Sequence, residues 1–389
     1  MQRICLVFYE GYIDLAPTVR SIINFLSRRG KLDVFISKNQ EFSTNFISDN
    51  LYVNWHLINT TDSFLIKFLS NKVTRRILPF RNLISNHQKI YELKQFAKGM
   101  GKIHFDQIFV IDATGLFILE NSKLTFEKKY YISLEIIDNV RNDLSFYEKK
   151  LLKFHWKKLS GFQKIIIQDR YRLEILFCKS EEKINVLFLP NSAELDTLIT
   201  EKDFFRNRYN ITPDQQIILV AGMVSNMTLS EDILIVFSNI LNDKIKLVIH
   251  DRMFNSGFSF LKNKYSKIVF SGQPLRYNEI DTIFSACDFG LVIYDTESTD
   301  RNFSVIGMAS GKFFNFLKNS KPVIVSNNLG LAQLVIELQC GIVINNLDEI
   351  ENAIEKINLN YQFYSKNAFN AFRDRFVMDE ILETLVVDK

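Results

Sequence analysis

The sequence predicts an α/β protein with two doubly wound, Rossmann-like domains that face each other across a cleft. Its 389 residues are enough for two domains of the usual size, roughly 100–200 residues each. Short β-branched and aromatic runs alternate with longer stretches of helical period, which is the pattern of a parallel sheet with helices on both faces. A Pro190-Asn191 break separates a first series of such elements from a second.

The first series begins at the amino terminus. We expect a strand over 4–9, a helix over 18–29 that ends at Gly30, and a strand over 32–36. The further strands expected here are 107–111, 130–136, 164–168 and 186–189. The amino-terminal domain is therefore predicted to span residues 1–190.

The second series follows the Pro-Asn break and defines a domain over 191–357. Its expected strands are 216–221, 246–249, 267–270, 289–294, 322–325 and 341–344. Helices are expected between them at 231–241, 278–286, 312–318 and 331–338. Residues 358–389 have no strand pattern. We expect them to form a helical segment that packs back across the junction, through an apolar stripe of Phe363, Ala368, Phe372 and Phe376.

Composition narrows the functional classes. Hydrophobic residues make up 47% and charged residues 24% of the chain, which is ordinary for a soluble globular protein. A net charge of +4 gives no indication of a nucleic-acid partner. The chain has neither a signal-peptide pattern nor an apolar run long enough to cross a membrane, so we expect a cytoplasmic protein. Its four cysteines and five histidines are dispersed, and we expect no metal or other cofactor.

The stretch Ser310-Gly311-Lys312 opens one of the expected helices and is the most specific motif. Unpaired amides at a helix start, a glycine that permits close backbone approach, and a lysine charge together suit a diphosphate. A simpler alternative stays open, in which the serine caps the helix and the lysine is solvated.

Four segments around this motif resemble the carboxy-terminal, donor-binding half of bacterial GT-B glycosyltransferases of the group 1-like type. They are IVFSG at 268–272, ACDFGL at 286–291, SGK at 310–312 and KPVI at 321–324. The amino-terminal half is similar more loosely, through YISLE at 131–135, IQDR at 167–170 and LPNS at 189–192. The resemblance covers nearly the whole chain, but only the second half is specific.

The resemblance implies that the domain over 1–190 lies on the acceptor side and that the domain over 191–357 binds the donor. It also implies roles for individual residues. Lys312 would bind the phosphates of the donor together with the amides of Ser310 and Gly311, and the leaving diphosphate would need no metal. Asn315 stands where retaining relatives carry a glutamate that holds the ribose, so it lacks the charge-assisted hydrogen bonds of a carboxylate. The loop after Gly222 also lacks the basic residue that many relatives carry.

Three further residues are candidates at expected strand ends. Glu135 would emerge near the carboxyl end of a strand as a base or a sugar ligand, and the structural alternative is an ion pair with a residue such as Arg170. Asp14, in the first strand-to-helix loop, is a second acidic candidate for chemistry, although a helix cap is the alternative. Arg252 in His250-Asp251-Arg252 is a candidate donor contact or a solvated loop residue.

The segment 64–102 is strongly basic and carries one acid, Glu92, in its length. Nine cations alternate with apolar residues there: Lys67, Lys72, Arg75, Arg76, Arg81, Lys89, Lys94, Lys98 and Lys102. Such a segment suits an anionic membrane surface, which would give the protein a peripheral position on the inner face of the membrane. A core helix with a solvated basic face is the alternative.

These observations predict a glycosyltransferase that moves a sugar from a nucleotide-sugar donor to a glycan or lipid-linked acceptor in cell-surface polysaccharide biosynthesis. The missing glutamate at Asn315 motivates an alternative, a non-catalytic GT-B-like subunit that binds a partner enzyme or a glycan. A sugar-nucleotide epimerase of the same architecture would need paired acids and a histidine, and the scattered histidines disfavour it.

Overall fold

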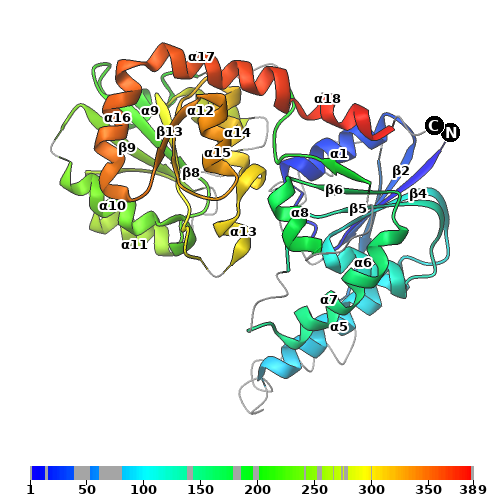
Figure 1. Cartoon of the computed structure of the whole chain (residues 1–389). Helices are drawn as coiled ribbons and strands as arrows, with labels where there is room; N and C mark the ends of the chain where they lie inside the picture. The colour runs from blue at the N-terminus through cyan, green and yellow to red at the C-terminus, as the bar shows by residue number, and fades with distance from the viewer. Residues whose placement is uncertain are drawn as a thin grey trace. The chain divides into compact units, whose positions relative to one another are not determined.

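A computed structural model describes residues 2–13, 16–38, 53–60, 81–137, 143–177, 185–195, 201–240, 242–251, 256–265, 267–272, 275, 279–298 and 300–386. The chain forms two compact units, Met1–Leu189 and Pro190–Lys389. Each unit is an α/β domain with its own parallel sheet (Figure 1). The predicted α/β, doubly wound fold class is therefore confirmed.

The first unit contains a seven-stranded sheet in the order β3-β2-β1-β4-β5-β6-β7, and every pair of neighbours is parallel. The strands are β1 (Arg3–Phe8), β2 (Lys31–Ser37), β3 (Val53–Ile58), β4 (His104–Ile111), β5 (Thr125–Ile132), β6 (Lys164–Ile167) and β7 (Val186–Phe188). Because the central strands are covered on both faces, they read as continuous apolar runs.

Helices cover this sheet along the crossover connections. They are α1 (Pro17–Ser27), α5 (Arg81–Gly99), α6 (Asp112–Asn121), α7 (Phe146–Lys158) and α8 (Arg170–Phe177). Proline at the first position of α1 fits the start of a helix, where an amide would have no partner. Buried side chains of α5, α6 and α7 form one core with alternate residues of β1, such as Cys5 and Val7.

The second unit contains a six-stranded parallel sheet in the order β10-β9-β8-β11-β12-β13. Its strands are β8 (Gln216–Ala221), β9 (Ile245–His250), β10 (Val269–Ser271), β11 (Phe289–Val292), β12 (Val323–Ser326) and β13 (Gly341–Ile344). This order is the one of the dinucleotide-binding Rossmann fold.

Helices lie on both faces of the second sheet. They are α9 (Phe204–Tyr209), α10 (Ser230–Asn239), α11 (Ser256–Lys264), α12 (Ile280–Ser285), α13 (Arg301–Ser304), α14 (Gly311–Lys318), α15 (Leu331–Leu338), α16 (Ile350–Leu359), α17 (Tyr361–Ala371) and α18 (Met378–Glu383). One core contains buried residues of α12, α14 and α15, and the other contains those of α10 and α16. On the first face α14 approaches β11 closely, since a Cβ at Gly290 would lie 2.3 Å from the ring of Phe316.

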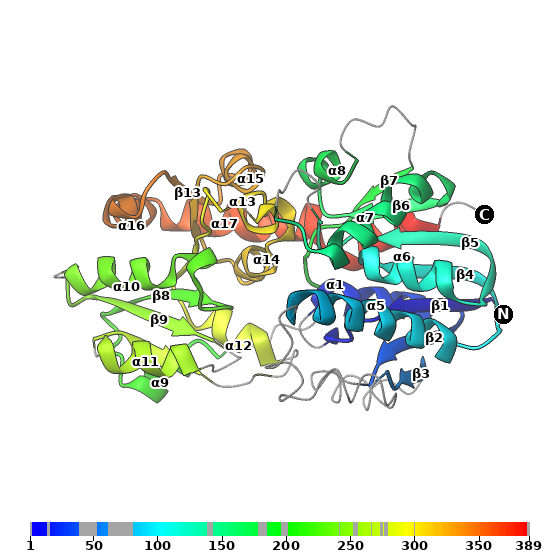
Figure 2. The same cartoon turned by 90° about the horizontal axis from the view of Figure 1, so that it is seen from below.

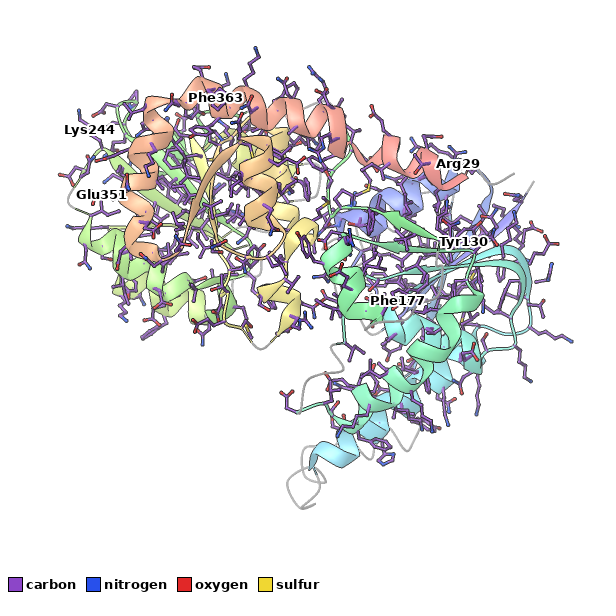
Figure 3. All side chains as sticks on the ribbon, viewed as in Figure 1. Arg29, Tyr130, Phe177, Lys244, Glu351 and Phe363 are labelled. Carbon is purple, nitrogen blue, oxygen red and sulfur yellow. The ribbon has the colours of Figure 1, made fainter. Side chains whose placement is uncertain are left out.

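The carboxy-terminal segment is helical, as expected, and includes a π-helical turn at Phe372–Phe376. Figure 2 shows α17 running beside α14 and α15, and Phe372 is buried in the same core as Phe314 of α14. One residue of the predicted stripe was assigned wrongly. Phe363 is 49% exposed and points outward (Figure 3), because it lies five residues before Ala368 and so falls off the helix face that Ala368 and Phe372 share.

Two strands differ most from expectation. Strand β5 ends at Ile132 instead of reaching 136, because the amides of Leu134 and Glu135 donate to the carboxylate of Asp112 and leave the ladder. Strand β3 is an additional edge strand. Its polar Asn54 and His56 bind Asp33 of β2, which hides the usual apolar pattern of a buried strand.

Candidate functional site

Ligands of open α/β sheets bind outside the carboxyl ends of the strands, where the strand order reverses. In the first sheet this point lies between β1 and β4, and in the second between β8 and β11. Each unit places a distinct group of side chains there. We call Glu10, Asp112 and Glu135 the acidic edge of the first unit, and Tyr294, Ser310, Lys312 and Asn315 the α14 site of the second.

The α14 site is built around Tyr294, which follows β11. Its ring lies under the ammonium of Lys312, with Nζ 4.3 Å from the ring centroid, and its hydroxyl is 2.9 Å from Oγ of Ser310. Ser310 occupies the N-cap position of α14, but its side chain makes no capping hydrogen bond. The simple-cap alternative for this serine is therefore wrong, since its hydroxyl binds the tyrosine.

Lys312 has no anionic partner among the described residues. Burial lowers the pKa of its ammonium to about 7, although part of the side chain remains at the surface. Lys318, at the other end of the same helix, forms a buried ion pair with Asp281 at 2.9 Å. Within the described chain, the charge of Lys318 is therefore balanced by a carboxylate and the charge of Lys312 is not. Lys312 lies in the first turn of α14, where backbone amides have no partner within the helix.

Asn315 lies one turn after Lys312 on the same face of α14. It is 9% exposed. Within the described part of the chain its side-chain amide makes no hydrogen bond, while its backbone carbonyl accepts one from the amide of Asn319. This side-chain amide can therefore both donate hydrogen bonds to a bound molecule and accept them from it.

The loop before α14 is held by Asn191 from the start of the second unit. The backbone amide of Asn191 donates to the carbonyl of Met308 at 2.8 Å, and its side-chain amide donates to that of Ala309 at 3.1 Å. A Cβ at Gly311 would lie 3.1 Å from the same side-chain nitrogen. Gly311 therefore lets this asparagine fix the start of the helix that carries Lys312.

Gly222, at the end of β8, borders open space. Its φ is +106°, and a Cβ there would meet no atom within 4 Å. The residue therefore supplies a left-handed backbone without filling the space beside it.

The acidic edge brings three carboxylates together from three strand ends. Thr114 donates to Oε1 of Glu10 at 2.7 Å, and Oε2 of Glu10 is buried with no hydrogen-bond partner in the described chain. Burial, followed by the charge of Glu10, raises the pKa of Asp112 well above its usual range. Burial also raises the pKa of Glu10, and the charge of Glu135 adds to this effect.

Glu135 is exposed and lies in the turn after β5. Arg170, which the structural alternative named as an example of a partner, pairs with Glu174 of its own helix at 3.0 Å. The sequence prediction missed Glu10 and Asp112. Both are the first acidic residues after buried strands, and that position is the signal that could have found them.

Two predicted site residues, Asp14 and Arg252, lie outside the described residues. Of the neighbours of Arg252, His250 is buried, with Nδ1 3.0 Å from Oγ of Ser271, and Asp251 is buried too. Both are packed within the strand ends of β9 and β10.

One group of described side chains has the chemistry of a metal site. Ligand atoms of His104, Asp106 and Glu127 all lie within 4.8 Å of one another, at the amino ends of β4 and β5. This end of the sheet is opposite to the acidic edge, so the group takes no part in the candidate site.

The basic segment is described from Arg81 onward, and the cations from Lys67 to Arg76 lie outside the described residues. Helix α5 buries Ile90, Leu93 and Phe96 in the core of the first unit, as the core-helix alternative expects. Lys94, Lys98 and Lys102 are exposed. Within the described residues, no helix is long and apolar enough to cross a membrane.

Comparison with known proteins adds to this geometry. Residues 252–376 match the family model of the glucosyltransferase 3-like C-terminal domain. Sucrose-phosphate synthase from Thermosynechococcus elongatus is similar in structure, with a TM-score of 0.67, 13% identity, and coverage of 99% of this chain and 97% of the other. Comparison with curated protein sequences finds no match.

Two further solved structures are similar over the whole chain. HepE from Anabaena, in complex with UDP-glucose, has a TM-score of 0.64 and 12% identity, with 100% of both chains covered. The trehalose 6-phosphate synthase of Burkholderia multivorans has a TM-score of 0.64 and 11% identity, with 100% of this chain and 96% of the other covered.

The class follows from these likenesses and from the two Rossmann-like sheets: the chain has the GT-B glycosyltransferase fold. The residues of the second unit that match the glucosyltransferase 3-like C-terminal domain model, 252–376, include the whole α14 site.

Proposed function

We propose that the protein is a glycosyltransferase that uses a nucleotide-sugar donor, whose diphosphate is bound at the α14 site. The observation that carries the proposal is the ammonium of Lys312, which lies at the first turn of α14 without an anionic partner in the described chain. A diphosphate would supply the missing negative charge. The unpaired amides of the same turn would add hydrogen bonds to it.

The geometry also supports a role for Asn315 toward the nucleotide. Its side-chain amide has no partner in the described chain and can both donate and accept hydrogen bonds, as a ribose requires. We propose that it takes the place of the usual glutamate, with weaker, neutral hydrogen bonds.

A uridine diphosphate sugar is the donor that we propose to test first. HepE, one of the similar structures, binds UDP-glucose, and the family model that matches the second unit is described as glucosyltransferase 3-like. When the glycosidic bond to the diphosphate breaks, negative charge develops on the leaving phosphate. Lys312 and the amides of α14 would stabilise that charge electrostatically.

Glu135 is the proposed acceptor-side group. It is an exposed carboxylate at the carboxyl edge of the first sheet, and a carboxylate there can take the proton of an acceptor hydroxyl. The acceptor that we propose is a glycan or a lipid-linked sugar of cell-surface polysaccharide synthesis.

Donor binding is tested by thermal unfolding with UDP, GDP, CMP and dTDP. A ligand at 100 times its Kd stabilises a protein by about 2.7 kcal/mol, and we expect the largest shift with UDP. Lys312→Ala should weaken UDP binding about 10- to 100-fold, because hydrogen bonds to charged groups contribute roughly 1.5–3 kcal/mol. The matched control is Lys264→Ala, which removes an exposed lysine of the same unit that pairs with Glu231. Equal UDP affinity in the two variants would show that the diphosphate does not bind at Lys312.

A peripheral position at an anionic membrane is the second part of the proposal. The exposed cations Lys94, Lys98 and Lys102 support it, and each cation near anionic lipid contributes about 1 kcal/mol. Flotation with vesicles of phosphatidylcholine alone and with phosphatidylserine, at low and high salt, is the measurement. Binding should require the acidic lipid and low salt, whereas equal recovery on both vesicles would leave α5 as a core helix only.

The alternative function, a non-catalytic GT-B-like subunit, is kept because Asn315 replaces the glutamate of retaining relatives. Release of UDP from UDP-glucose in the presence or absence of acceptor decides between the two. Any turnover that Lys312→Ala abolishes argues against the subunit.

A further inference from the structure

The turn Ser133-Leu134-Glu135 after β5 is held by buried side chains from two neighbouring strand ends. Oδ1 of Asp112, at the end of β4, accepts hydrogen bonds from the amides of Leu134 at 2.7 Å and Glu135 at 3.0 Å. Two amides that would otherwise be solvated are thereby fixed to one carboxylate. The position of the Glu135 backbone is set at its amide.

The carbonyls of the same turn are held from the other side, by residues that follow β6. The side-chain amide of Gln168 donates to the carbonyl of Ser133 at 2.7 Å, and the guanidinium of Arg172 donates to that of Leu134 at 2.8 Å. Arg172 is 1% exposed, and its Nε donates to Gln168 at 2.8 Å, which joins the two holding side chains. A buried guanidinium needs such partners for its donors.

Asp112 is unusual in its own backbone as well. Its φ is +56°, in the left-handed region that residues with a Cβ rarely adopt. Asp112 is the first residue of α6, and no side chain caps this helix. The carboxylate of Asp112 instead accepts hydrogen bonds from the neighbouring turn. The left-handed conformation persists because contacts outside its own helix fix it, which is typical of residues at functional sites.

We propose that Asp112 is a positioning residue that fixes the exposed carboxylate of Glu135 for the acceptor reaction, with Gln168 and Arg172 holding the other side of the turn. This inference rests on the proposed role of Glu135. Asp112 itself acts through the backbone of the turn. A reacting group displaced by about 1 Å can lose roughly 10²-fold in rate, so loosening the turn should be costly.

Three variants test the inference. Asp112→Gly removes the carboxylate while keeping a residue suited to positive φ, and Asp112→Asn keeps one neutral acceptor oxygen and tolerates the same backbone. The matched control is Asp33→Asn, a buried aspartate of β2 that binds His56 at 2.7 Å and Arg3 at 3.2 Å, away from the turn. All three are compared with the wild type for kcat, for donor KM, and for hydrogen–deuterium exchange of the peptide that contains residues 131–137.

We expect Asp112→Gly to lower kcat about 10²-fold with the donor KM unchanged within about twofold, and to expose the amides of the 131–137 peptide to faster exchange. Asp112→Asn should lie between this variant and the wild type, because a neutral acceptor makes a weaker hydrogen bond. Asp33→Asn should lower the melting temperature and change neither kcat nor exchange at the turn.

The exchange measurement separates this inference from the proposed function. If Glu135→Gln has full activity, Glu135 loses its proposed role, while faster exchange in the Asp112 variants would still show that Asp112 holds the turn. If Asp112→Gly does not fold, Asp112→Asn decides. Wild-type kcat per folded molecule together with wild-type exchange in the folded Asp112 variants would overturn the positioning role, as would a loss confined to the donor KM.

Discussion

The two sheets share a strand order around their first strands, β3-β2-β1-β4 in one and β10-β9-β8-β11 in the other, yet they place opposite chemistry at the point where the order reverses. In the first unit burial raises the pKa values of two acids, Glu10 and Asp112. In the second unit burial lowers the pKa of Lys312. The comparison shows that strand order determines where a site forms and that the residues following each strand determine what it can bind.

The two regions also differ in how their polar groups are satisfied. At the acidic edge the turn that carries Glu135 donates hydrogen bonds to Asp112 after β4 and accepts them from Gln168 and Arg172 after β6. At the α14 site Lys312 and Asn315 keep charge or hydrogen-bonding capacity unused within the described chain. A preformed turn suits a group that must be placed for chemistry, and unused capacity suits a group that meets a charged ligand.

We expect the largest effect from a substitution at the acidic edge, Glu135→Gln. Glu135→Gln keeps the shape of the side chain but removes the proton acceptor, so the transfer rate should fall roughly 10²–10⁴-fold with little change in UDP affinity. Because the side chain of Glu135 is exposed, the substitution should change the melting temperature little. Steady-state rates, UDP titration and thermal unfolding on one preparation measure all three. A stable variant with wild-type rate would exclude Glu135 from the chemistry.

The next effect separates the two lysines of α14. Asp281→Asn leaves the buried ammonium of Lys318 without its anionic partner, which should lower the free energy of unfolding by about 3–5 kcal/mol. UDP affinity should stay the same, because this pair lies at the end of the helix opposite to Lys312. Chemical denaturation gives the first quantity and titration the second. Replacing both partners by Met and Leu should restore most of the stability, and a loss of UDP affinity in Asp281→Asn would contradict the division between the lysines.

The smallest expected effect is a dependence of donor affinity on pH, which arises from Lys312 at the α14 site. Since the pKa of Lys312 is about 7, its ammonium is present below pH 7 and is lost as the pH rises through that value. The affinity for UDP-glucose should therefore be greatest below pH 7 and fall by up to tenfold for each pH unit above it. Calorimetric titrations from pH 6 to 9 test this. Lys312→Arg should flatten the profile, because a guanidinium stays charged throughout; an equally steep profile in that variant would assign the titration to another group.

The fold and the α14 site could be predicted because local patterns determine them. Apolar runs bounded by polar loops placed β8, β13 and α15 at the residues where the structure has them. Ser310-Gly311-Lys312 lies at the start of a helix in both prediction and structure. Only the structure shows that the hydroxyl of Ser310 binds Tyr294.

The acidic edge could not be predicted in full because it depends on contacts between distant residues. Strand β5 ends early because the amide of Leu134 donates to Asp112, which lies more than twenty residues upstream in the sequence. Glu10 meets Thr114 across 104 positions. A pattern within one segment can mark Glu10 and Asp112 as acids that follow buried strands, but it contains no information about these contacts. It therefore cannot show that the two acids lie near Glu135.

The close approach at Gly290 has a consequence for how this protein can change during evolution. The ring of Phe316 occupies the space where a side chain at position 290 would begin, and Phe316 lies on the helix that carries both Lys312 and Asn315. Any larger residue at 290 must push that helix away from the sheet unless position 316 becomes smaller at the same time. Positions 290 and 316 should therefore vary together among related chains. Chains that bind a nucleotide at this helix should keep either glycine at 290 with an aromatic ring at 316, or a larger residue at 290 with a smaller one at 316.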